Sequence, residues 1–266
     1  MSSALGGAQL KQCCAGFYGS DAARWLLADC WHPGGLELTR RLAEQLQLSA
    51  DSRLLDVACG TGGSALMIAD TFGCQVHGVD LSARNVEQAT RAAAERGLCA
   101  RASFELGDAE GLSVASQRFD ALLCECALCT FPDKRAAAGE FHRVLRVGGR
   151  LALSDVTRRP AALTGLDDLA GWVACIADAL PLPAYAQCLL EAGFCEVQTE
   201  DRSDTLQALI ERIAGRLAAG ELLAGLAQVP LSAGELQQAR GLLTTAHEAV
   251  RRGQLGYGVV TARKGA

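Results

Sequence analysis

The sequence lacks several features that mark common classes of protein. Its 266 residues contain no run of eighteen apolar residues, which excludes a membrane-spanning helix. Residues 1–10 lack the charged segment followed by an apolar one that marks a secretory signal. Basic residues are not in excess, since 25 Lys and Arg stand against 30 Asp and Glu, and a net charge of −5 argues against non-specific nucleic-acid binding. We therefore expect a cytoplasmic protein that needs neither a membrane nor a nucleic acid as partner.

Histidine is also scarce, with four residues, whereas cysteine is plentiful, with twelve. A disulfide framework is typical of small secreted domains, and this chain is long, with half of its residues apolar. We therefore expect reduced thiols. Many of them should fill the core, because a free cysteine behaves as a small hydrophobic residue.

Strand-like and helix-like segments alternate from residue 53 onward, which is typical of a parallel sheet with helices on both faces. We predict an α/β fold with a doubly wound, mostly parallel, seven-stranded sheet. The domains are expected as an N-terminal helical cap at 1–48, a core at 49–204, a helical insertion at 205–255 and a last core strand at 256–266. The strands are expected at residues 53–58, 75–79, 102–106, 119–124, 150–155, 196–200 and 256–263.

The first motif with clear chemistry is the glycine-rich turn LLDVACGTGGSA at residues 54–65. Its glycines let the backbone pass close to a ligand between a strand and a helix. The turn fits G-x-G-x-x-G poorly, which disfavours a nicotinamide dehydrogenase. It also lacks the Gly-Lys-Ser/Thr of a phosphate loop. Asp80 ends the second strand, where a carboxylate can accept both ribose hydroxyls of an adenosine. Asp108 follows the third strand and can accept from an adenine amine.

These motifs resemble those of the class I S-adenosylmethionine-dependent methyltransferases. LLDVACGTG at 54–62, HGVDLS at 77–82, LGDAEGL at 106–112 and the segment 142–155 are similar to four motifs of that family. The resemblance implies S-adenosyl-L-methionine as cofactor, with Gly60 and Gly62 against its methionine and ribose. Position 58 often carries glycine in the family, and we expect the extra methyl group of Ala58 to matter little. The implied cofactor-binding residues are Asp56, Ala58, Gly60, Thr61, Gly62, Asp80, Leu81, Asp108, Ala109 and Cys124.

The thiols of the fourth-strand segment indicate an acceptor. A period of two places Cys124 and Cys126 on one side of the strand. Residues 126–134 are similar to a motif of the arsenite methyltransferases, in which a cysteine lies six residues before Pro-Asp-Lys, and Cys175 matches a second thiol 49 residues later. The resemblance implies that Cys126 and Cys175 bind trivalent arsenic as substrate. Thiolates are soft ligands and bind such soft centres in preference to hard ones. A cysteine thiol must lose its proton to become a thiolate, so we expect a lowered pKa at Cys126 or Cys175.

The N-terminal region shares a Cys-Cys pair, Cys13 and Cys14, and a Tyr-Gly element, Tyr18-Gly19, with the same branch. That element is followed there by a further ligating thiol, whereas this chain has Ser20. The third thiol would then come from Cys13, Cys14 or Cys30. A thiol reductant such as glutathione or thioredoxin is the partner that the resemblance implies.

Three alternatives remain open at the level of the sequence. One is a methyltransferase for a small organic acceptor, such as a quinone precursor or natural product, in which the cysteines only pack. Another is a thiol-rich metal-binding protein that uses Cys124-x-Cys126-x-x-Cys129. The third is the nicotinamide dehydrogenase that the glycine-rich turn disfavours.

Overall fold

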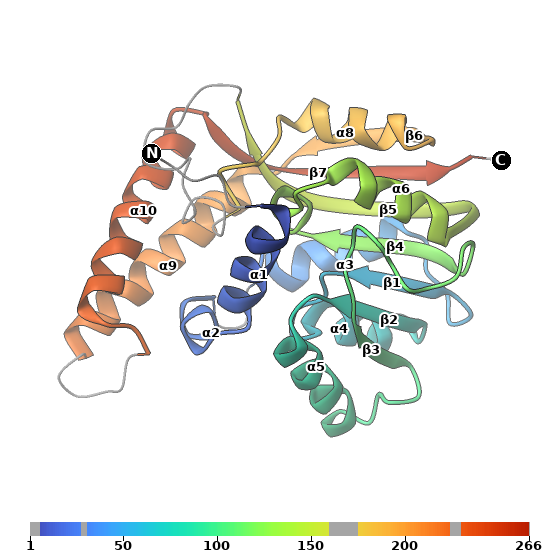
Figure 1. Cartoon of the computed structure of the whole chain (residues 1–266), viewed down its shortest axis with the longest axis horizontal. Helices are drawn as coiled ribbons and strands as arrows, with labels where there is room; N and C mark the ends of the chain where they lie inside the picture. Colours follow the sequence, from blue (N-terminus) through green and yellow to red (C-terminus); the bar gives the residue numbers. More distant parts are fainter. Residues whose placement is uncertain (1–5, 28–30, 160–174, 224–229, 266) are drawn as a thin grey trace.

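The computed structural model describes residues 6–27, 31–159, 175–223 and 230–265. Within these ranges the strands form one seven-stranded sheet in the order β3-β2-β1-β4-β5-β7-β6 (Figure 1). The pairs from β3 to β5 are parallel, and β7 runs antiparallel to both β5 and β6. The strands are β1 (Arg53–Val57), β2 (Gln75–Asp80), β3 (Ala102–Leu106), β4 (Phe119–Glu125), β5 (Leu145–Arg158), β6 (Phe194–Asp201) and β7 (Leu255–Lys264).

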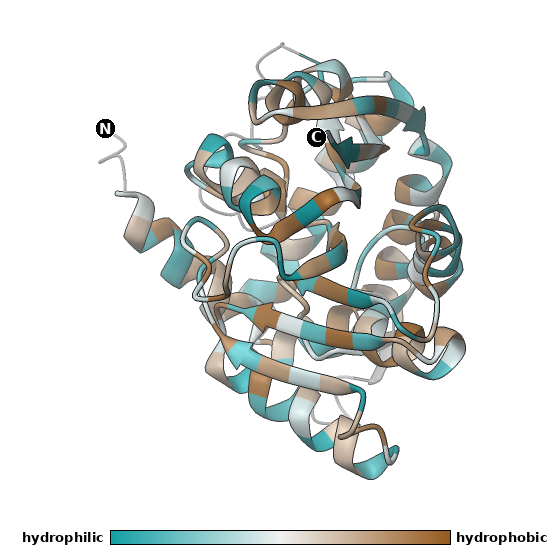
Figure 2. Cartoon of the chain, turned by 90° about the vertical axis from the view of Figure 1, so that its right-hand side faces the viewer, coloured by the Kyte–Doolittle hydropathy of each residue, from teal (hydrophilic) through white to brown (hydrophobic). Residues whose placement is uncertain are grey.

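Helices cover both faces of this sheet, so its central strands read as continuous apolar runs. Two hydrophobic clusters result: one lies beneath α3 (Gly35–Gln45), α4 (Gly63–Phe72) and α5 (Ala83–Glu95). The other lies beneath α6 (Lys134–Val144) and α8 (Leu182–Glu191). Figure 2 shows hydrophobic stretches along the strands between these layers. The predicted fold class is confirmed.

All seven predicted strands are present, and β5 is the one whose length differs most from the prediction. It begins at Leu145, five residues before the predicted start, because Leu145 already pairs with Phe119. A register irregularity follows, and regular pairing resumes between Ala121 and Arg150. The glycines at 148 and 149, which the sequence suggested as the entry to the strand, lie within this irregular part.

The remaining helices lie at the end of the sheet where the parallel strands terminate (Figure 1). They are α1 (Gly7–Tyr18) and α2 (Asp21–Leu27) from the N-terminal region, and α9 (Ser203–Leu223) and α10 (Ala233–Arg251), which lie between β6 and β7 in the chain. Arg216 on α9 donates a hydrogen bond to the carbonyl of Trp25 on α2 at 3.0 Å. The late helices thus support the N-terminal ones. No helix in the described ranges is long and apolar enough to cross a membrane.

Candidate functional site

A pocket opens at the carboxyl ends of β1, β2 and β4 and is closed on one side by α1. This position follows from the topology, because the strand order reverses between β1 and β4 and leaves a crevice outside their carboxyl ends. Of the predicted cofactor residues, six line the pocket: Asp56, Ala58, Gly60, Thr61, Asp80 and Leu81.

The turn after β1 has three residues with positive φ: Ala58 (57°), Gly60 (54°) and Gly62 (81°). Ala58 therefore lies in the left-handed region, and its backbone conformation, more than its small methyl group, is why glycine suits this position. Gly62 is placed differently from the prediction. It is not among the lining residues, and an added Cβ there would lie 2.9 Å from the Cβ of Ala89 on α5 and 3.0 Å from Phe104. Gly62 thus allows close packing behind the turn.

Asp80 is held rigidly at the pocket wall. One carboxylate oxygen accepts from the Gly60 N–H at 2.8 Å, and the other accepts from the Ser82 N–H at 2.8 Å and from the Asn85 side chain at 3.2 Å. Burial raises the pKa of Asp80, while these donors act in the opposite direction. Each oxygen retains acceptor capacity toward the pocket.

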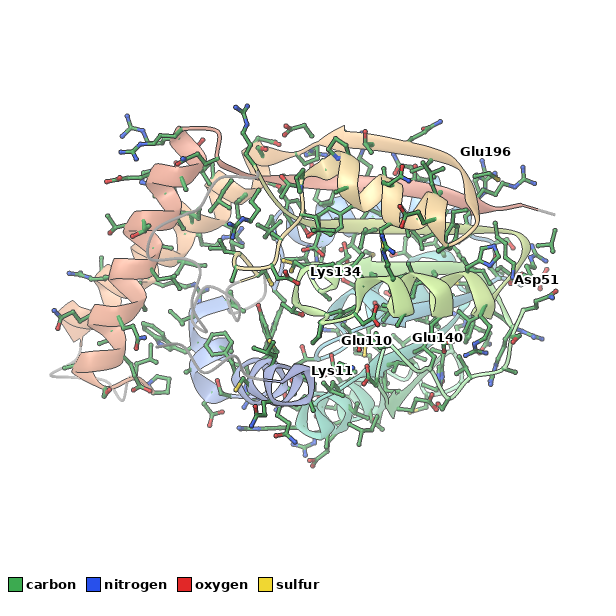
Figure 3. The ribbon with its side chains drawn as sticks, turned by 45° about the horizontal axis from the view of Figure 1, so that its top comes forward. Lys11, Asp51, Glu110, Lys134, Glu140 and Glu196 are labelled. Carbon is green, nitrogen blue, oxygen red and sulfur yellow. The ribbon has the colours of Figure 1, made fainter. Side chains whose placement is uncertain are left out.

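Asp108 is placed at the edge of the site and not in its lining. Its carboxylate accepts from the Lys11 Nζ on α1 at 2.7 Å, and the same ammonium lies 2.5 Å from Glu110. Figure 3 shows Lys11 beside Glu110 at this edge. Ala109 and Cys124, also predicted to bind the cofactor, are buried in the hydrophobic cluster beneath α6 and α8, so the structure places both in the core.

Two acidic side chains, Asp56 and Glu125, form part of the pocket floor, and the sequence analysis singled out only Asp56. Asp56 is 3% exposed, and its Oδ2 atom has no hydrogen-bond partner in the described part of the chain. Burial, and then the charges of Glu125 and Asp80, raise its pKa well above the ordinary value. An unpartnered buried carboxylate oxygen beside a second carboxylate suits a cationic ligand.

Glu125, at the end of β4, was missed in the sequence. Its carboxylate accepts from Ser64 at 2.6 Å and from Thr39 at 3.1 Å, and lies 3.4 Å from Nε2 of His32. The sequence feature that could have indicated Glu125 is its position at the end of the fourth strand, directly before Cys126. Three donors from two helices and a loop converge on it, which no local pattern encodes.

The structure brings three thiols and a tyrosine together beside this floor, and we call Cys126, Cys129, Cys175 and Tyr18 the thiol cluster. The hydroxyl of Tyr18 lies 3.2 Å from the sulfur of Cys175. The Cys175 thiol also donates to the carbonyl oxygen of Cys126 at 3.5 Å, and Cys126 and Cys129 have the largest effects on its pKa. Cys126 and Tyr18 line the pocket, so the cluster forms part of its wall.

Cys175 is the member of the cluster whose pKa is lowered. Hydrogen bonds from the thiols of Cys126 and Cys129, and then from Tyr18, hold the pKa of Cys175 well below its ordinary value against the effect of burial. The same contacts raise the pKa of the donors: at Cys126 the hydrogen bond to Cys175 is the main cause, and at Cys129 and Tyr18 burial is. The lowered pKa predicted for Cys126 or Cys175 thus occurs at Cys175.

The segment that carries Cys175 is anchored from two sides. Lys134 donates to the carbonyl of Phe131 at 3.0 Å and forms a short ion pair with Asp178, three residues after Cys175. Arg158 donates to the carbonyl of Ala177 at 2.8 Å. The Pro-Asp-Lys lysine of the sequence motif thus ties the Cys175 segment to the loop after β4.

The predicted arrangement of the cysteines needs three corrections. Cys124 and Cys126 do not share a side, because β4 ends at Glu125 and Cys126 has a left-handed φ of 53°, so the period of two no longer applies. Of the N-terminal pair, Cys14 lines the pocket, whereas Cys13 is half-buried outside its lining. Cys129, which the sequence analysis assigned only to a metal-binding alternative, belongs to the thiol cluster. Cys30 lies outside the described residues.

The metal-binding alternative finds no support in the described ranges. No group of three or more His, Cys, Asp or Glu side chains there is arranged to hold a metal ion. The buried position of Cys124 also removes it from the Cys-x-Cys-x-x-Cys set.

Comparisons with known proteins agree with this geometry. A family model described as "Methyltransferase domain" matches residues 54–149. Phosphoethanolamine N-methyltransferase 1 of Triticum aestivum is 32% identical over 183 residues, which cover 68% of this chain and 36% of that protein. The chain thus spans little more than a third of the length of the first such relatives.

Two further proteins match over nearly the whole chain. The solved structure of the [4+2]-cyclase SpnF superimposes with a TM-score of 0.79 at 26% identity and covers 96% of both chains. The 27-O-demethylrifamycin SV methyltransferase of Amycolatopsis mediterranei (strain S699) is 33% identical over 235 residues, which cover 85% of this chain and 82% of that protein. Together with the motif residues that line the pocket, this match shows that the chain belongs to the class I S-adenosylmethionine-dependent methyltransferases.

Proposed function

We propose that this protein methylates trivalent arsenic, supplied as arsenite and held by cysteine thiolates, with S-adenosyl-L-methionine as methyl donor. The observation that carries the proposal is the thiol cluster. Two cysteines 49 residues apart in the sequence, Cys126 and Cys175, lie in contact beside the cofactor pocket, with Cys126 in its lining, and the pKa of the Cys175 thiol is lowered. A core cysteine needs neither a lowered pKa nor a place beside a pocket.

The residues around the pocket fit the cofactor. Asp80 would accept the ribose hydroxyls, and Gly60 would let the backbone approach the cofactor without an intervening side chain. The ammonium and sulfonium charges would suit the acidic floor made by Asp56 and Glu125, because a cation there would favour the ionised carboxylates and give the unpartnered oxygen of Asp56 a partner. When bound, S-adenosyl-L-methionine supplies an electrophilic methyl group, whose bond to sulfur breaks as the lone pair of arsenic forms the new bond to carbon.

The thiol cluster prepares the acceptor. The Cys175 thiolate attacks trivalent arsenic, and the hydroxide that leaves takes a proton from the Cys126 thiol and departs as water. The new Cys126 thiolate then displaces a second hydroxide, which takes a proton from solvent. Each arsenic–sulfur bond thus releases one water. The lone pair stays on arsenic, so the methyl transfer itself needs no general base, in keeping with the few histidines of the chain.

The further contribution of the protein is alignment and the exclusion of water. Such positioning can lower a barrier by up to about 7–11 kcal/mol in favourable systems. Methyl transfer raises the formal oxidation state of arsenic from three to five. A small thiol or thioredoxin, acting as two-electron reductant, returns the product to the trivalent state.

The test is to incubate the purified protein with S-adenosyl-L-methionine, arsenite and a thiol reductant, and to separate the arsenic species by chromatography with elemental detection. We expect methylated arsenic from the wild type and a loss of at least a hundredfold in the Cys126→Ser and Cys175→Ser variants. Cys74→Ser is the matched control, because Cys74 is a fully buried thiol in the core that does not line the pocket. Full activity in both cluster variants would refute the proposal.

A second candidate acceptor is a small organic molecule, favoured by the 33% identity to the rifamycin methyltransferase over most of both chains. In that case the wild type binds the cofactor but forms no methylated arsenic. The SpnF match adds that this fold also occurs in a cyclase. Release of S-adenosyl-L-homocysteine is therefore the readout that separates methyl transfer from other reactions.

A further inference from the structure

We propose that α1 is a lid over the cofactor pocket, hinged at its C-terminal end and latched in its N-terminal half by the ion pairs of Lys11. The latch then sets the rate at which the cofactor and its product enter and leave. The inference concerns the cofactor end of the pocket, so it holds whether the methyl acceptor is arsenite or an organic molecule.

The inward face of α1 is directed at the pocket and not at the core. Its pocket-lining residues are three and four positions apart, which places them on one side of the helix: Lys11, Cys14, Ala15 and Tyr18. Among the residues of α1, all of which the structure describes, Cys14 is the buried one. Helices in proteins gain most of their stability by packing an apolar face on other elements. Moving α1 therefore exposes little of the core.

The C-terminal end of α1 is fixed against the sheet. Tyr18 packs on the hydrophobic cluster beneath α3, α4 and α5, and its hydroxyl lies 3.2 Å from the sulfur of Cys175. At Gly19 an added Cβ would lie 2.7 Å from the hydroxyl of Ser82, so the backbone there lies close against the turn after β2. Gly16 weakens the helix just before this anchor, because glycine inside a helix is destabilising. We place the hinge at residues 16–19.

The N-terminal half of α1 is held by ion pairs. The Nζ atom of Lys11 lies 2.7 Å from Asp108 and 2.5 Å from Glu110, both in the segment after β3 (Figure 3). Glu110 is itself fixed, because it accepts from the Asp133 N–H at 2.8 Å. One ammonium thus joins the lid to two carboxylates of the pocket edge. The side chains of Lys11 and Asp108 are 19% and 40% exposed, so water can replace these contacts when the lid opens.

The latch joins two parts of the protein and needs no ligand atom. In Asp108 one oxygen accepts from Lys11 and the other from the Glu110 N–H at 3.0 Å, and each oxygen can accept a further bond. The latch therefore stabilises the closed lid with or without the cofactor. Its loss should speed entry and exit by similar factors and leave the affinity nearly unchanged. A residue that only contacts the bound cofactor would change the affinity instead.

Stopped-flow binding of S-adenosyl-L-homocysteine tests the proposal, with tryptophan fluorescence as the signal because Trp31 lines the pocket. In Lys11→Met the association and dissociation rate constants should both rise at least fivefold, with a dissociation constant within twofold of the wild type. Lys11→Arg should keep both rate constants within twofold. Arg41→Met is the matched control, because it removes an ion pair with Glu200 outside the pocket lining, and it should change neither rate constant.

A second variant and the ionic strength sharpen the test. Glu110→Gln weakens the latch and keeps an acceptor for the Asp133 N–H, so its rate constants should lie between those of the wild type and Lys11→Met. S-adenosyl-L-homocysteine carries no net charge, so salt acts mainly on the latch. Raising the ionic strength to about 0.5 M should speed exchange in the wild type and not in Lys11→Met, because salt screens partly exposed ion pairs.

Two kinetic results would overturn the proposal. If Lys11→Met speeds dissociation alone, Lys11 acts only on the bound cofactor and α1 is no lid. If both rate constants match the wild type, the ion pairs of Lys11 hold nothing that limits exchange.

Hydrogen exchange of the α1 amides reports on the lid itself. Lys11→Met should speed exchange at residues 7–18 at least threefold and leave α8, which lies outside the pocket lining, unchanged, because opening of the lid is local. Unchanged exchange in α1 would contradict the hinge even if ligand exchange became faster.

Discussion

Two cysteines of the thiol cluster have a backbone conformation that favours glycine. Cys126 has a φ of 53° and Cys175 a φ of 63°. A non-glycine residue in the left-handed region costs about 1–2 kcal/mol. Such strain persists where surrounding contacts impose it, and it is concentrated at functional sites. At Cys126 the N–H donates to the carbonyl of Ser154 on β5 at 2.7 Å, which holds the residue in this conformation as the strand ends.

Asp155 is the buried carboxyl group next to this cluster, and it makes stability depend on pH. Burial, and then the charge of Cys175, raise the pKa of Asp155 to about 7 from an ordinary value of 3.8. A raised pKa means that the folded protein binds the proton more tightly than the unfolded chain does. Protonated Asp155 therefore contributes its full stabilisation of the folded protein below about pH 4. This contribution is lost as the pH rises through about 7.

The residue-scale prediction concerns the Asp155→Asn variant. Asparagine keeps an acceptor for the Cys129 N–H and removes the titration. Between pH 4 and pH 7 the wild type should lose stability relative to the variant, on the order of 4 kcal/mol at most. Thermal unfolding of both proteins across this range measures the difference. A constant difference between the two would show that Asp155 does not titrate there.

At the scale of elements, the site is assembled from the end of β4, the helix α1 and the segment at residues 175–180. Hydrogen bonds from Lys134 and Arg158 hold this segment, and the Tyr185 hydroxyl on α8 bridges the Leu180 N–H and the Val156 carbonyl. Lys134 has two effects, because its charge also helps to lower the pKa of Cys175. The lysine of the motif thus both fixes the segment and favours the thiolate.

The element-scale prediction separates these two effects. Lys134→Met should cost about 2 kcal/mol of stability, as expected for losing a hydrogen-bonded charge, and should move the Cys175 titration to higher pH. Asp178→Asn should also lower stability but leave the Cys175 titration where it is in the wild type, because the ammonium remains. The thiolate absorbance titration, taken as the difference from Cys175→Ser, and urea unfolding give the two readouts. Equal titrations in all variants would assign Lys134 a purely structural role.

At the scale of the whole molecule, the N-terminal helices close a pocket that the sheet leaves open. Lys11 ties α1 to Asp108 and Glu110 at one edge, and Tyr18 ties the same helix to Cys175 at the other. The cofactor pocket and the thiol cluster therefore share α1 as a wall. Binding to this enclosed site should stabilise the entire fold.

The corresponding prediction is a thermal shift. S-adenosyl-L-homocysteine at a hundred times its dissociation constant should stabilise the protein by about 2.7 kcal/mol, which raises the Tm by roughly 5–10 °C for a chain of this size. Asp80→Asn should reduce the shift at the same concentration, because the ribose loses its acceptor. Asp70→Asn, at an exposed carboxylate on α4, is the control and should keep the full shift. An undiminished shift in Asp80→Asn would remove Asp80 from the cofactor site.

The sequence by itself determined the seven strands, the doubly wound class and the position of the cofactor turn. Each depends on local patterns, namely buried runs, helical spacing and glycines at positions that need positive φ. It also singled out Cys126 and Cys175, through spacing that resembles one branch of the family; the structure places the two in contact, and their role in the site stays a prediction. The local sequence could not predict the packing role of Gly62, because that role depends on Ala89 and Phe104 from other elements.

Only the tertiary structure decided which side chains meet at the pocket. Glu125 gains its partners from three separate segments, and Tyr18 meets Cys175 across 157 residues of chain. Cys124 does not share a side with Cys126, because β4 ends at Glu125 and Cys126 adopts a left-handed backbone conformation. Contacts between distant segments and departures from a regular period have no signature in the order of residue types, so they emerge only when the chain is packed.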